Sequence, residues 1–161
     1  MLVVLGGLPA TGKTTLARLL AGRTGAVHLR VDTIEQALVR SGLARHPVGP
    51  AGYVVGFALA EEHLRQGLSV VAESVNPLAV TRDAAVRAGV PCVEVEVVCS
   101  DPVEHRRRVD SRSVDIPDLP LPGWEQIVER EYEPWHRERA VVDTAGRGVE
   151  ESLGSLLRML G

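Results

Sequence analysis

The loop at residues 7–14 restricts the folds open to this chain more than any other segment. It reads Gly-Leu-Pro-Ala-Thr-Gly-Lys-Thr and matches the phosphate-binding pattern G-x-x-x-x-G-K-[ST] in full. An apolar run, Leu2–Gly6, precedes the loop, and a helical pattern begins at Lys13. A chance glycine-rich turn is the alternative, but the strand, the spacing, the lysine and the threonine all agree with a phosphate-binding strand, loop and helix.

Lys13 is the only lysine in the chain, although the sequence holds 18 basic side chains. A compact ammonium group threads a ring of backbone amides better than a wide planar guanidinium does. We therefore expect Lys13 to reach the β- and γ-phosphates of a nucleotide and the Thr14 hydroxyl to bind Mg²⁺. The predicted nucleotide-binding residues of the loop are Gly7, Leu8, Pro9, Ala10, Thr11, Gly12, Lys13, Thr14 and Thr15.

The sequence favours ATP over GTP as the nucleotide. A guanine-reading N-K-x-D motif needs an asparagine followed by a lysine, whereas Asn76 is the only asparagine and Lys13 the only lysine. We therefore predict ATP and Mg²⁺ as the cofactors.

Length and composition indicate a single domain over residues 1–161. A chain of 161 residues with 45% apolar and 24% charged residues is long enough for one core and short for two. The net charge of -3 makes nucleic acid a less expected partner. No run approaches the ~20 apolar residues of a membrane span, so no membrane partner is expected. The opening apolar run has no basic flank, which argues against a signal peptide.

The two cysteines, Cys92 and Cys99, fall in one extended run. At ~3.3 Å per residue they lie roughly 23 Å apart, which exceeds the ~7 Å limit of a disulfide. Unpaired thiols suit a reducing compartment, so we expect a cytoplasmic protein.

Short apolar runs alternate with longer amphipathic segments, which predicts an α/β fold with parallel layers. The expected strands are Leu2–Gly6, Val27–Val31, Ser69–Glu73, Cys92–Cys99 and Ala140–Asp143. The expected helices are approximately Lys13–Thr24, Thr33–Ser41, Gly52–Gln66, Pro77–Ala88, Pro102–Ser111, Trp124–Glu133 and Glu150–Leu160. Two proline-containing loops lie between predicted helices: Gly42–Ala51 and Ser113–Gly123. We interpret the second, residues 113–123, as a mobile lid, with a rigid connector as the alternative.

Two acids follow predicted strands. Asp32 comes directly after the second strand, beside the predicted phosphate loop, where a carboxylate suits a general base. Asp32 also fits a helix N-cap with Glu35 as its capping-box partner, and both roles are compatible. Glu73 ends the third strand, where an acid binds Mg²⁺ directly or through water, although a solvated strand end is the alternative.

Four arginines cluster on the helix before the proline-rich loop: Arg106, Arg107, Arg108 and Arg112. Arg108 and Arg112 are four residues apart and share a helix face. We expect these two to neutralise charge on a transferring phosphate, with a solvated face paired to acids as the alternative. The sequence does not separate Arg106, Arg107 and Arg108 as contacts of adenine.

Taken with the loop, these residues make the whole chain resemble the small P-loop kinases of the AAA_33 type. That group includes chloramphenicol phosphotransferase, the zeta toxins, gluconate-type kinases and 5′-hydroxyl polynucleotide kinases. The resemblance implies transfer of the ATP γ-phosphate to a hydroxyl, on a three-layer α/β/α fold with a five-stranded parallel sheet of order 2-3-1-4-5. It also implies that Asp32 accepts the hydroxyl proton and that Lys13, Arg108 and Arg112 are catalytic.

Glu35 departs from this resemblance. The polynucleotide kinases of the group carry an arginine three residues after the catalytic aspartate, where it binds a phosphate of the acceptor. A carboxylate there repels a nucleic-acid phosphate, so we expect a small hydroxyl compound as the acceptor.

Further polar residues are expected around the acceptor: Asp32, Glu73, Ser74, Asn76 and Tyr53. The five aromatic residues, Tyr53, Phe57, Trp124, Tyr132 and Trp135, lie outside the loop and first helix, and they form either a pocket wall or core. The histidines show no metal-ligand spacing.

Three functions agree with the sequence. The first is an ATP-dependent kinase for a small hydroxyl compound, with an Asp base and an Arg-bearing lid. The second is a nucleoside, nucleotide or 5′-hydroxyl polynucleotide kinase, and the third is a non-catalytic ATP-dependent switch or binding module. The sequence sets neither the acceptor nor the oligomeric state.

Overall fold

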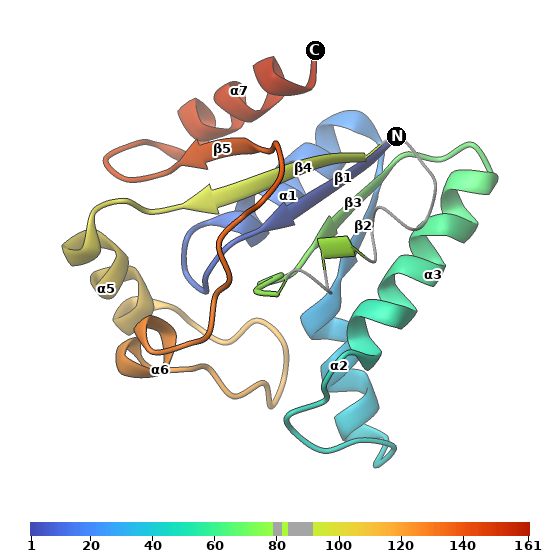
Figure 1. Cartoon of the computed structure of the whole chain (residues 1–161), viewed down its shortest axis with the longest axis horizontal. Coiled ribbons are helices and arrows are strands. Elements are labelled where there is room, and N and C mark those ends of the chain that lie inside the picture. Colours follow the sequence, from blue (N-terminus) through green and yellow to red (C-terminus); the bar gives the residue numbers. More distant parts are fainter. Residues whose placement is uncertain (79–81, 84–91) are drawn as a thin grey trace.

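The phosphate-loop strand lies at the centre of an all-parallel sheet in the computed structural model, which describes residues 1–78, 82–83 and 92–161. The described strands are β1 Leu2–Gly6, β2 Val27–Arg30, β3 Val70–Glu73, β4 Cys92–Val98 and β5 Ala140–Asp143. In this part of the chain they form a five-stranded sheet of order β2-β3-β1-β4-β5 (Figure 1). The predicted α/β class and the predicted strand order are both confirmed.

The described helices are α1 Lys13–Thr24, α2 Val31–Arg40, α3 Ala51–Arg65, α5 Pro102–Ser111, α6 Trp124–Val128 and α7 Val149–Leu160. Most of these match the predicted ranges to within two residues. The predicted helix Pro77–Ala88 lies mostly outside the described residues. The prediction Trp124–Glu133 was too long, because the chain beyond α6 leaves the helix and the Glu133 amide donates to Pro77 O at 2.9 Å.

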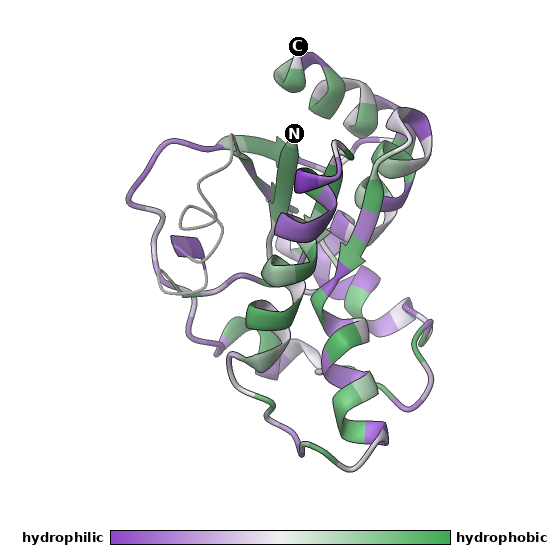
Figure 2. Ribbon diagram, turned by 90° about the vertical axis from the view of Figure 1, so that its right-hand side faces the viewer, coloured by the Kyte–Doolittle hydropathy of each residue, from purple (hydrophilic) through white to green (hydrophobic). Residues whose placement is uncertain are grey.

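Helices cover both faces of the sheet, and the strands are accordingly apolar (Figure 2). On one face, α1 and α7 pack on the odd-numbered side chains of β1 and on Val95 and Val97 of β4. On the other face, Phe57 and Ala60 of α3 pack on the even-numbered side chains of β1 and on β3. Because β1 is buried from both sides, the loop that follows it starts from a fixed position.

The segment between α6 and β5, residues 129–139, crosses the second face of β4 as a strap (Figure 1). Glu94 and Glu96 point to this face and are nearly buried, and they pair with Arg137 and Arg139, the second pair at 2.6 Å. Burying two carboxylates is tolerable here because each has a guanidinium partner.

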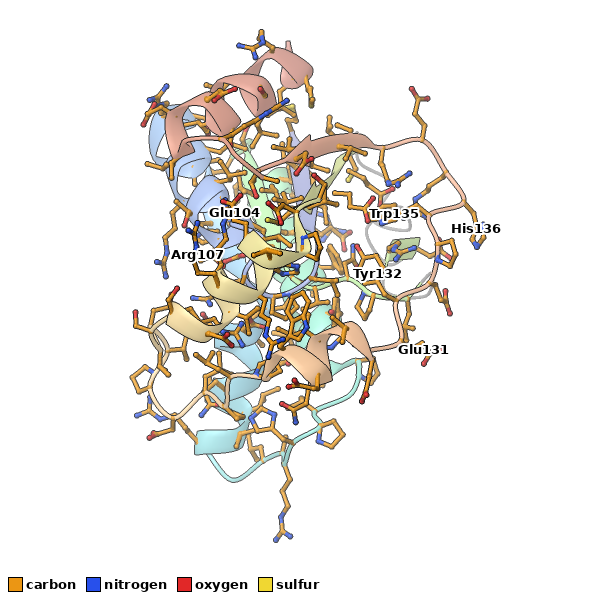
Figure 3. The ribbon with its side chains drawn as sticks, turned by 90° about the vertical axis from the view of Figure 1, so that its left-hand side faces the viewer. Glu104, Arg107, Glu131, Tyr132, Trp135 and His136 are labelled. Carbon is orange, nitrogen blue, oxygen red and sulfur yellow. The ribbon has the colours of Figure 1, made fainter. Side chains whose placement is uncertain are left out.

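Arg82 ties this strap to the end of β3. It is only 2% exposed, and its guanidinium carbon lies 4.2 Å from the Trp135 ring centroid and 5.3 Å from that of Tyr132. It donates to four backbone carbonyls, those of Asn76, Pro77, Glu133 and Pro134. Tyr132 and Trp135 turn inward from the strap, whereas Glu131 and His136 point outward (Figure 3). This buried cation therefore fixes the backbone just beyond β3.

Two further expectations concern the cysteines and membrane-spanning helices. Both Cys92 and Cys99 are free thiols, as the spacing predicted. Among the described helices, none combines the length and the apolar character that a membrane crossing requires.

Candidate functional site

The phosphate loop, residues 7–14, closes tightly because its backbone uses conformations that few residues adopt. Gly7 has φ 144°, and a Cβ built there would lie 2.2 Å from Val97 O. Gly12, at φ 98°, caps the start of α1. Ala10 also has a positive φ, 64°, which is uncommon for a residue with a side chain. A turn of this kind, leading into a helix N-terminus, directs backbone N–H groups toward an anion.

Two residues that the sequence analysis did not identify hold this loop in place. His105, buried on α5, lies with Nε2 2.8 Å from Pro9 O. Thr144, just after β5, donates from Oγ1 to Thr11 O at 2.8 Å. The available signal for His105 was its spacing of four from Val109, which places a histidine on the buried face of α5. Thr144 carried no signal, because its role depends on contact across the sheet.

Lys13 is buried at the first turn of α1 and lines the cavity beside the loop. Its Nζ lies 3.5 Å from Leu8 O. Burial lowers the pKa of Lys13, while the nearby carboxylates of Glu73 and Asp32 act in the opposite direction. An ammonium held this way, with carboxylates nearby but no ion pair of its own among the described residues, is available to a bound phosphate.

Glu73 and Thr14 meet at the end of β3. The Thr14 hydroxyl donates to Glu73 Oε2 at 2.9 Å. The other oxygen, Oε1, lies 3.4 Å from His28 Nε2 and 3.3 Å from Arg30 Nε. Burial alone would raise the pKa of Glu73, but His28, Lys13, Thr14 and Arg30 together hold that pKa below its usual value. Glu73 is therefore an ionised carboxylate at neutral pH.

The hydroxyl of Thr14 and the carboxylate of Glu73 fit a magnesium ion. Both are oxygen ligands, which Mg²⁺ prefers, and it commonly keeps several waters and substrate phosphates as its other ligands. In the described part of the chain no three acids, histidines or cysteines group into a metal cage.

Asp32 lies in the first turn of α2, with its side chain 33% exposed, and it lines the same cavity as Lys13. The predicted capping box is wrong: the N-cap of α2 is Arg30, and no side chain caps it. The reason is that β2 runs straight into α2, so that Asp32 is already helical. Its carboxylate is 3.9 Å from Arg30 Nη2 and otherwise open to the cavity.

Arg108 and Arg112 both line the cavity. They do not share a helix face as predicted, because α5 ends at Ser111 and Arg112 follows it in an extended conformation. Arg108 is already engaged: it donates to Thr144 Oγ1 at 2.8 Å, to Thr144 O at 2.9 Å and to Glu104 Oε1 at 2.6 Å. Arg112 donates to Pro122 O, while its Nε is buried without a hydrogen-bond partner in the described structure. Burial lowers the pKa of Arg112, with Asp32 opposing the shift. Of the two, Arg112 has the greater unused donor capacity.

The other two arginines of the cluster, Arg106 and Arg107, are exposed and line a separate shallow groove with Trp124. Figure 3 shows Arg107 on the outer side of α5. The structure therefore places them outside the main cavity.

The predicted lid, residues 113–123, lies over this cavity. Leu119, Pro120, Leu121 and Pro122 line the cavity from this side. Asp115 anchors the segment, because its Oδ2 accepts hydrogen bonds from Arg18 and Arg30 at 2.6 Å each. One carboxylate thus joins the lid to α1 and to β2. Whether the segment moves stays a prediction.

The cavity has a volume of about 1080 Å³. Among the described residues, six basic side chains and three carboxylates line it, although the whole chain carries a net charge of -3. The basic residues are Lys13, Arg18, Arg30, Arg108, Arg112 and Arg130. This local excess of positive charge favours a polyanionic ligand.

The predicted acceptor residues divide into two groups. Tyr53 lines the cavity, and its hydroxyl accepts a hydrogen bond from the Asn76 amide at 3.2 Å. Ser74 and Asn76 are buried and do not line the cavity, so they lie behind its wall instead of at its surface. Of the remaining aromatics, Phe57 is core and Trp124 packs edge-on against His105.

Comparison with known proteins agrees with this geometry. The model of the AAA_33 family, described as an AAA domain, matches residues 2–134. No curated protein sequence matches the chain significantly.

Three solved structures share the fold. A sugar kinase from Janibacter sp. HTCC2649 is 15% identical with a TM-score of 0.75, over 99% of this chain and 93% of that one. A gluconokinase from Sinorhizobium meliloti 1021 is 17% identical with a TM-score of 0.65, over 98% and 91%. An APS kinase from Mycobacterium tuberculosis, in complex with AMPPNP and APS, is 18% identical with a TM-score of 0.68, over 99% and 96%.

Proposed function

The chain belongs to the AAA_33 family, and from this premise we propose that it is an ATP-dependent phosphotransferase whose acceptor is a hydroxyl of a small molecule. The observation that carries the proposal is that Lys13 and Asp32 line one cavity. A cation beside a phosphate loop and an open carboxylate on the acceptor side are the two groups that this reaction needs. The solved kinases that share the fold support the same reaction class.

The donor side holds the triphosphate. The backbone amides of residues 7–14 and the Lys13 ammonium bind the β- and γ-phosphates, and Thr14 and Glu73 would hold a Mg²⁺ ion. When bound, the metal neutralises phosphate charge. His105 and Thr144 keep the loop closed through Pro9 and Thr11.

The acceptor side supplies the nucleophile. Asp32 accepts the proton of the acceptor hydroxyl as its oxygen attacks the γ-phosphorus. The bond from that phosphorus to the β–γ bridging oxygen breaks, and ADP leaves with the bridging oxygen. The transition state is loose and spreads negative charge over the γ-phosphoryl oxygens. Lys13 and Arg112 neutralise this charge, since Arg112 has a donor free.

Arg108 has a different part in this proposal. Its bonds to Thr144 join α5 to the segment after β5, and its partner Glu104 adds a bond from the Gly146 amide. Thr144 in turn bonds the phosphate loop. Arg108 therefore fixes the loop through Thr144 and adds a positive charge to the cavity, without needing to move.

An acceptor screen tests the proposal. The purified chain is incubated with Mg²⁺, γ-labelled ATP and a library of sugars, sugar acids, amino alcohols, nucleosides and 5′-hydroxyl oligonucleotides, and transfer of the label is measured. We expect transfer to a small hydroxyl compound. Asp32→Asn should lower that rate roughly 10²-fold, within the range of general-base contributions.

Asp101→Asn is the matched control. Asp101 caps α5 through the amides of Val103 and Glu104, and asparagine caps equally well. Transfer at the wild-type rate in Asp32→Asn would contradict the assigned base. ATP binding without label transfer to any member would instead indicate a switch or binding module, and transfer only to oligonucleotides would indicate a polynucleotide kinase.

A further inference from the structure

Glu35 is a cavity residue for which the phosphotransfer mechanism has no use. It lies on α2 and contributes to the lining of the cavity. Its side chain makes no hydrogen bond or ion pair with any residue that the structure describes. A half-buried carboxyl group that lines a cavity without a protein partner keeps its hydrogen-bonding capacity for a ligand there.

The neighbouring helix leaves room for this side chain. A Cβ built on Gly52 of α3 would lie 2.4 Å from Glu35 Cγ and 2.8 Å from its Oε1. Gly52 has no positive φ, so its backbone conformation does not call for a glycine, whereas the contact with Glu35 does. The notch at Gly52 therefore seats the Glu35 carboxyl group at the edge of the cavity.

Asp32 and Glu35 are three residues apart on α2, so their side chains lie on one face of the helix. Both line the cavity. Burial, and then the Asp32 charge, raise the pKa of Glu35 to about 7, with Arg130 acting in the opposite direction. The acceptor side is thus a pair of adjacent carboxyl groups in an otherwise basic cavity.

The other polar groups of this wall do not satisfy Glu35. His46 Nε2 is 3.1 Å from Gln36 Oε1 and so already has a partner. The Tyr53 hydroxyl faces the backbone at Asn76. Arg130 is exposed and forms no ion pair with Glu35 in the described structure. None of these groups bonds to Glu35 in the described part of the chain, so its carboxyl group stays available to a ligand in the cavity.

We infer that Glu35 determines the acceptor class by accepting a hydrogen bond from a hydroxyl or ammonium group adjacent to the phosphorylated hydroxyl. The acceptor is then a polyol or an amino alcohol, and a phosphate at the adjacent position is excluded by repulsion from Glu35 and Asp32. This inference rests on the proposed function, because it takes Asp32 as the partner of the reacting hydroxyl.

A three-carbon series isolates the adjacent group. Glycerol, 2-amino-1,3-propanediol and glycerol 2-phosphate carry a hydroxyl, an ammonium or a phosphate on the same central carbon. Each is titrated into the full chain, wild type or variant, with Mg²⁺ and AMPPNP, and binding is followed by NMR through the backbone amide resonances of the cavity residues. In the wild type the ¹³C resonance of the Glu35 carboxyl group is followed as well. This measures binding alone, so its failure leaves the phosphotransfer proposal intact, and a failed acceptor screen leaves this result intact.

We expect glycerol and the amino alcohol to shift the Glu35 resonance, and glycerol 2-phosphate to bind at least about tenfold more weakly than the amino alcohol. Glu35→Gln, which keeps the shape of the side chain, should reduce that preference, and Glu35→Arg should reverse it. Glu61→Arg on α3, where Glu61 pairs with Arg65, is the matched control and should leave the order unchanged.

Three results would overturn the inference: tighter binding of the phosphate compound by the wild type, a Glu35 resonance that no member of the series shifts, or an unchanged order in both Glu35 variants. A folded state of each variant is checked by circular dichroism, and Glu35→Gln alone decides if Glu35→Arg does not fold.

Discussion

The two sides of the cavity differ in how complete they are without a ligand. On the donor side, the loop residues and their supports bond one another: Thr14 to Glu73, His105 to Pro9 and Thr144 to Thr11. On the acceptor side, Glu35 has no partner among the residues that the structure describes, and Asp32 has there only a distant one at 3.9 Å. The donor side is thus preorganised by the fold, while the acceptor side is left for its ligand to complete.

This difference has a physical reason. A triphosphate is bound largely by backbone amides and a helix N-terminus, which are products of the fold itself. An acceptor is distinguished by side chains, whose hydrogen-bonding capacity is useful only if the protein leaves it unsatisfied. Four variants, from the largest expected effect to the smallest, test this difference between the two sides.

Lys13→Ala should abolish the donor side. We expect phosphotransfer to fall on the order of 10³-fold, because the variant lacks the cation that neutralises the transferring phosphate. Label transfer from ATP measures this. The control is Arg23→Ala, on the same helix as Lys13. It removes an exposed ion pair with Glu150 of α7 and should keep its activity. Equal losses in the two variants would show that Lys13 acts only through the stability of α1.

Arg82→Ala should weaken the scaffold behind the acceptor side. Four backbone carbonyls would each lose one hydrogen bond and the strap would lose its buried cation, so we expect the free energy of unfolding to fall by at least about 3 kcal/mol. Urea denaturation followed by circular dichroism measures the change. Arg65→Ala, at an exposed pair, should change it by no more than about 0.5 kcal/mol. A small effect in Arg82→Ala would mean that the strap is held mainly by its other contacts.

Glu35→Gln should stabilise the protein at alkaline pH and not at acid pH. The folded-state pKa of Glu35, about 7, exceeds its ordinary value of 4.5, so the stability that this group contributes is lost as pH rises from 4.5 through 7. Because Glu35 is partly exposed, we expect the variant to gain only about 1–2 kcal/mol in the free energy of unfolding at alkaline pH, less than the full pKa shift would give. Unfolding of both proteins at pH 5 and pH 8 measures it. A gain of equal size at the two values would contradict the raised pKa.

Asp115→Asn should loosen the predicted lid. The variant lacks the charge that bridges Arg18 and Arg30. We therefore expect the free energy of local opening of residues 113–123 to fall by about 1 kcal/mol, which corresponds to roughly fivefold faster exchange of their amides. Hydrogen exchange measured by mass spectrometry reports it. Asp118→Asn, on the same segment and 4.0 Å from Arg40, is the matched control with a smaller expected effect. Unchanged exchange in Asp115→Asn would favour the rigid connector.

The donor side could be predicted from the sequence because its signals are local. The pattern at residues 7–14, the strand before it and the acid at Glu73 lie at fixed positions in the chain, and the structure brings Thr14 and Glu73 together at 2.9 Å. The positions of all five strands followed in the same way from apolar runs.

The supports and the acceptor wall depend on contacts between distant segments. His105 contacts a loop residue that is 96 positions away in the sequence, and Thr144 contacts one that is 133 positions away. No local pattern encodes such contacts. The capping box at Asp32 failed because the sequence does not show that β2 passes into α2 without a turn. The Gly52 notch that seats Glu35 likewise exists only once α2 and α3 are packed.

Nucleotide binding without turnover tests the division of the cavity most directly. Calorimetric titration with AMPPNP compares the wild type, Glu73→Gln and Asp32→Asn, each with Mg²⁺ and with EDTA. The account predicts one bound nucleotide per wild-type chain and binding about tenfold weaker in Glu73→Gln with Mg²⁺ only. It predicts an unchanged affinity in Asp32→Asn. Absence of binding by the wild type, or equal weakening in both variants, would contradict it.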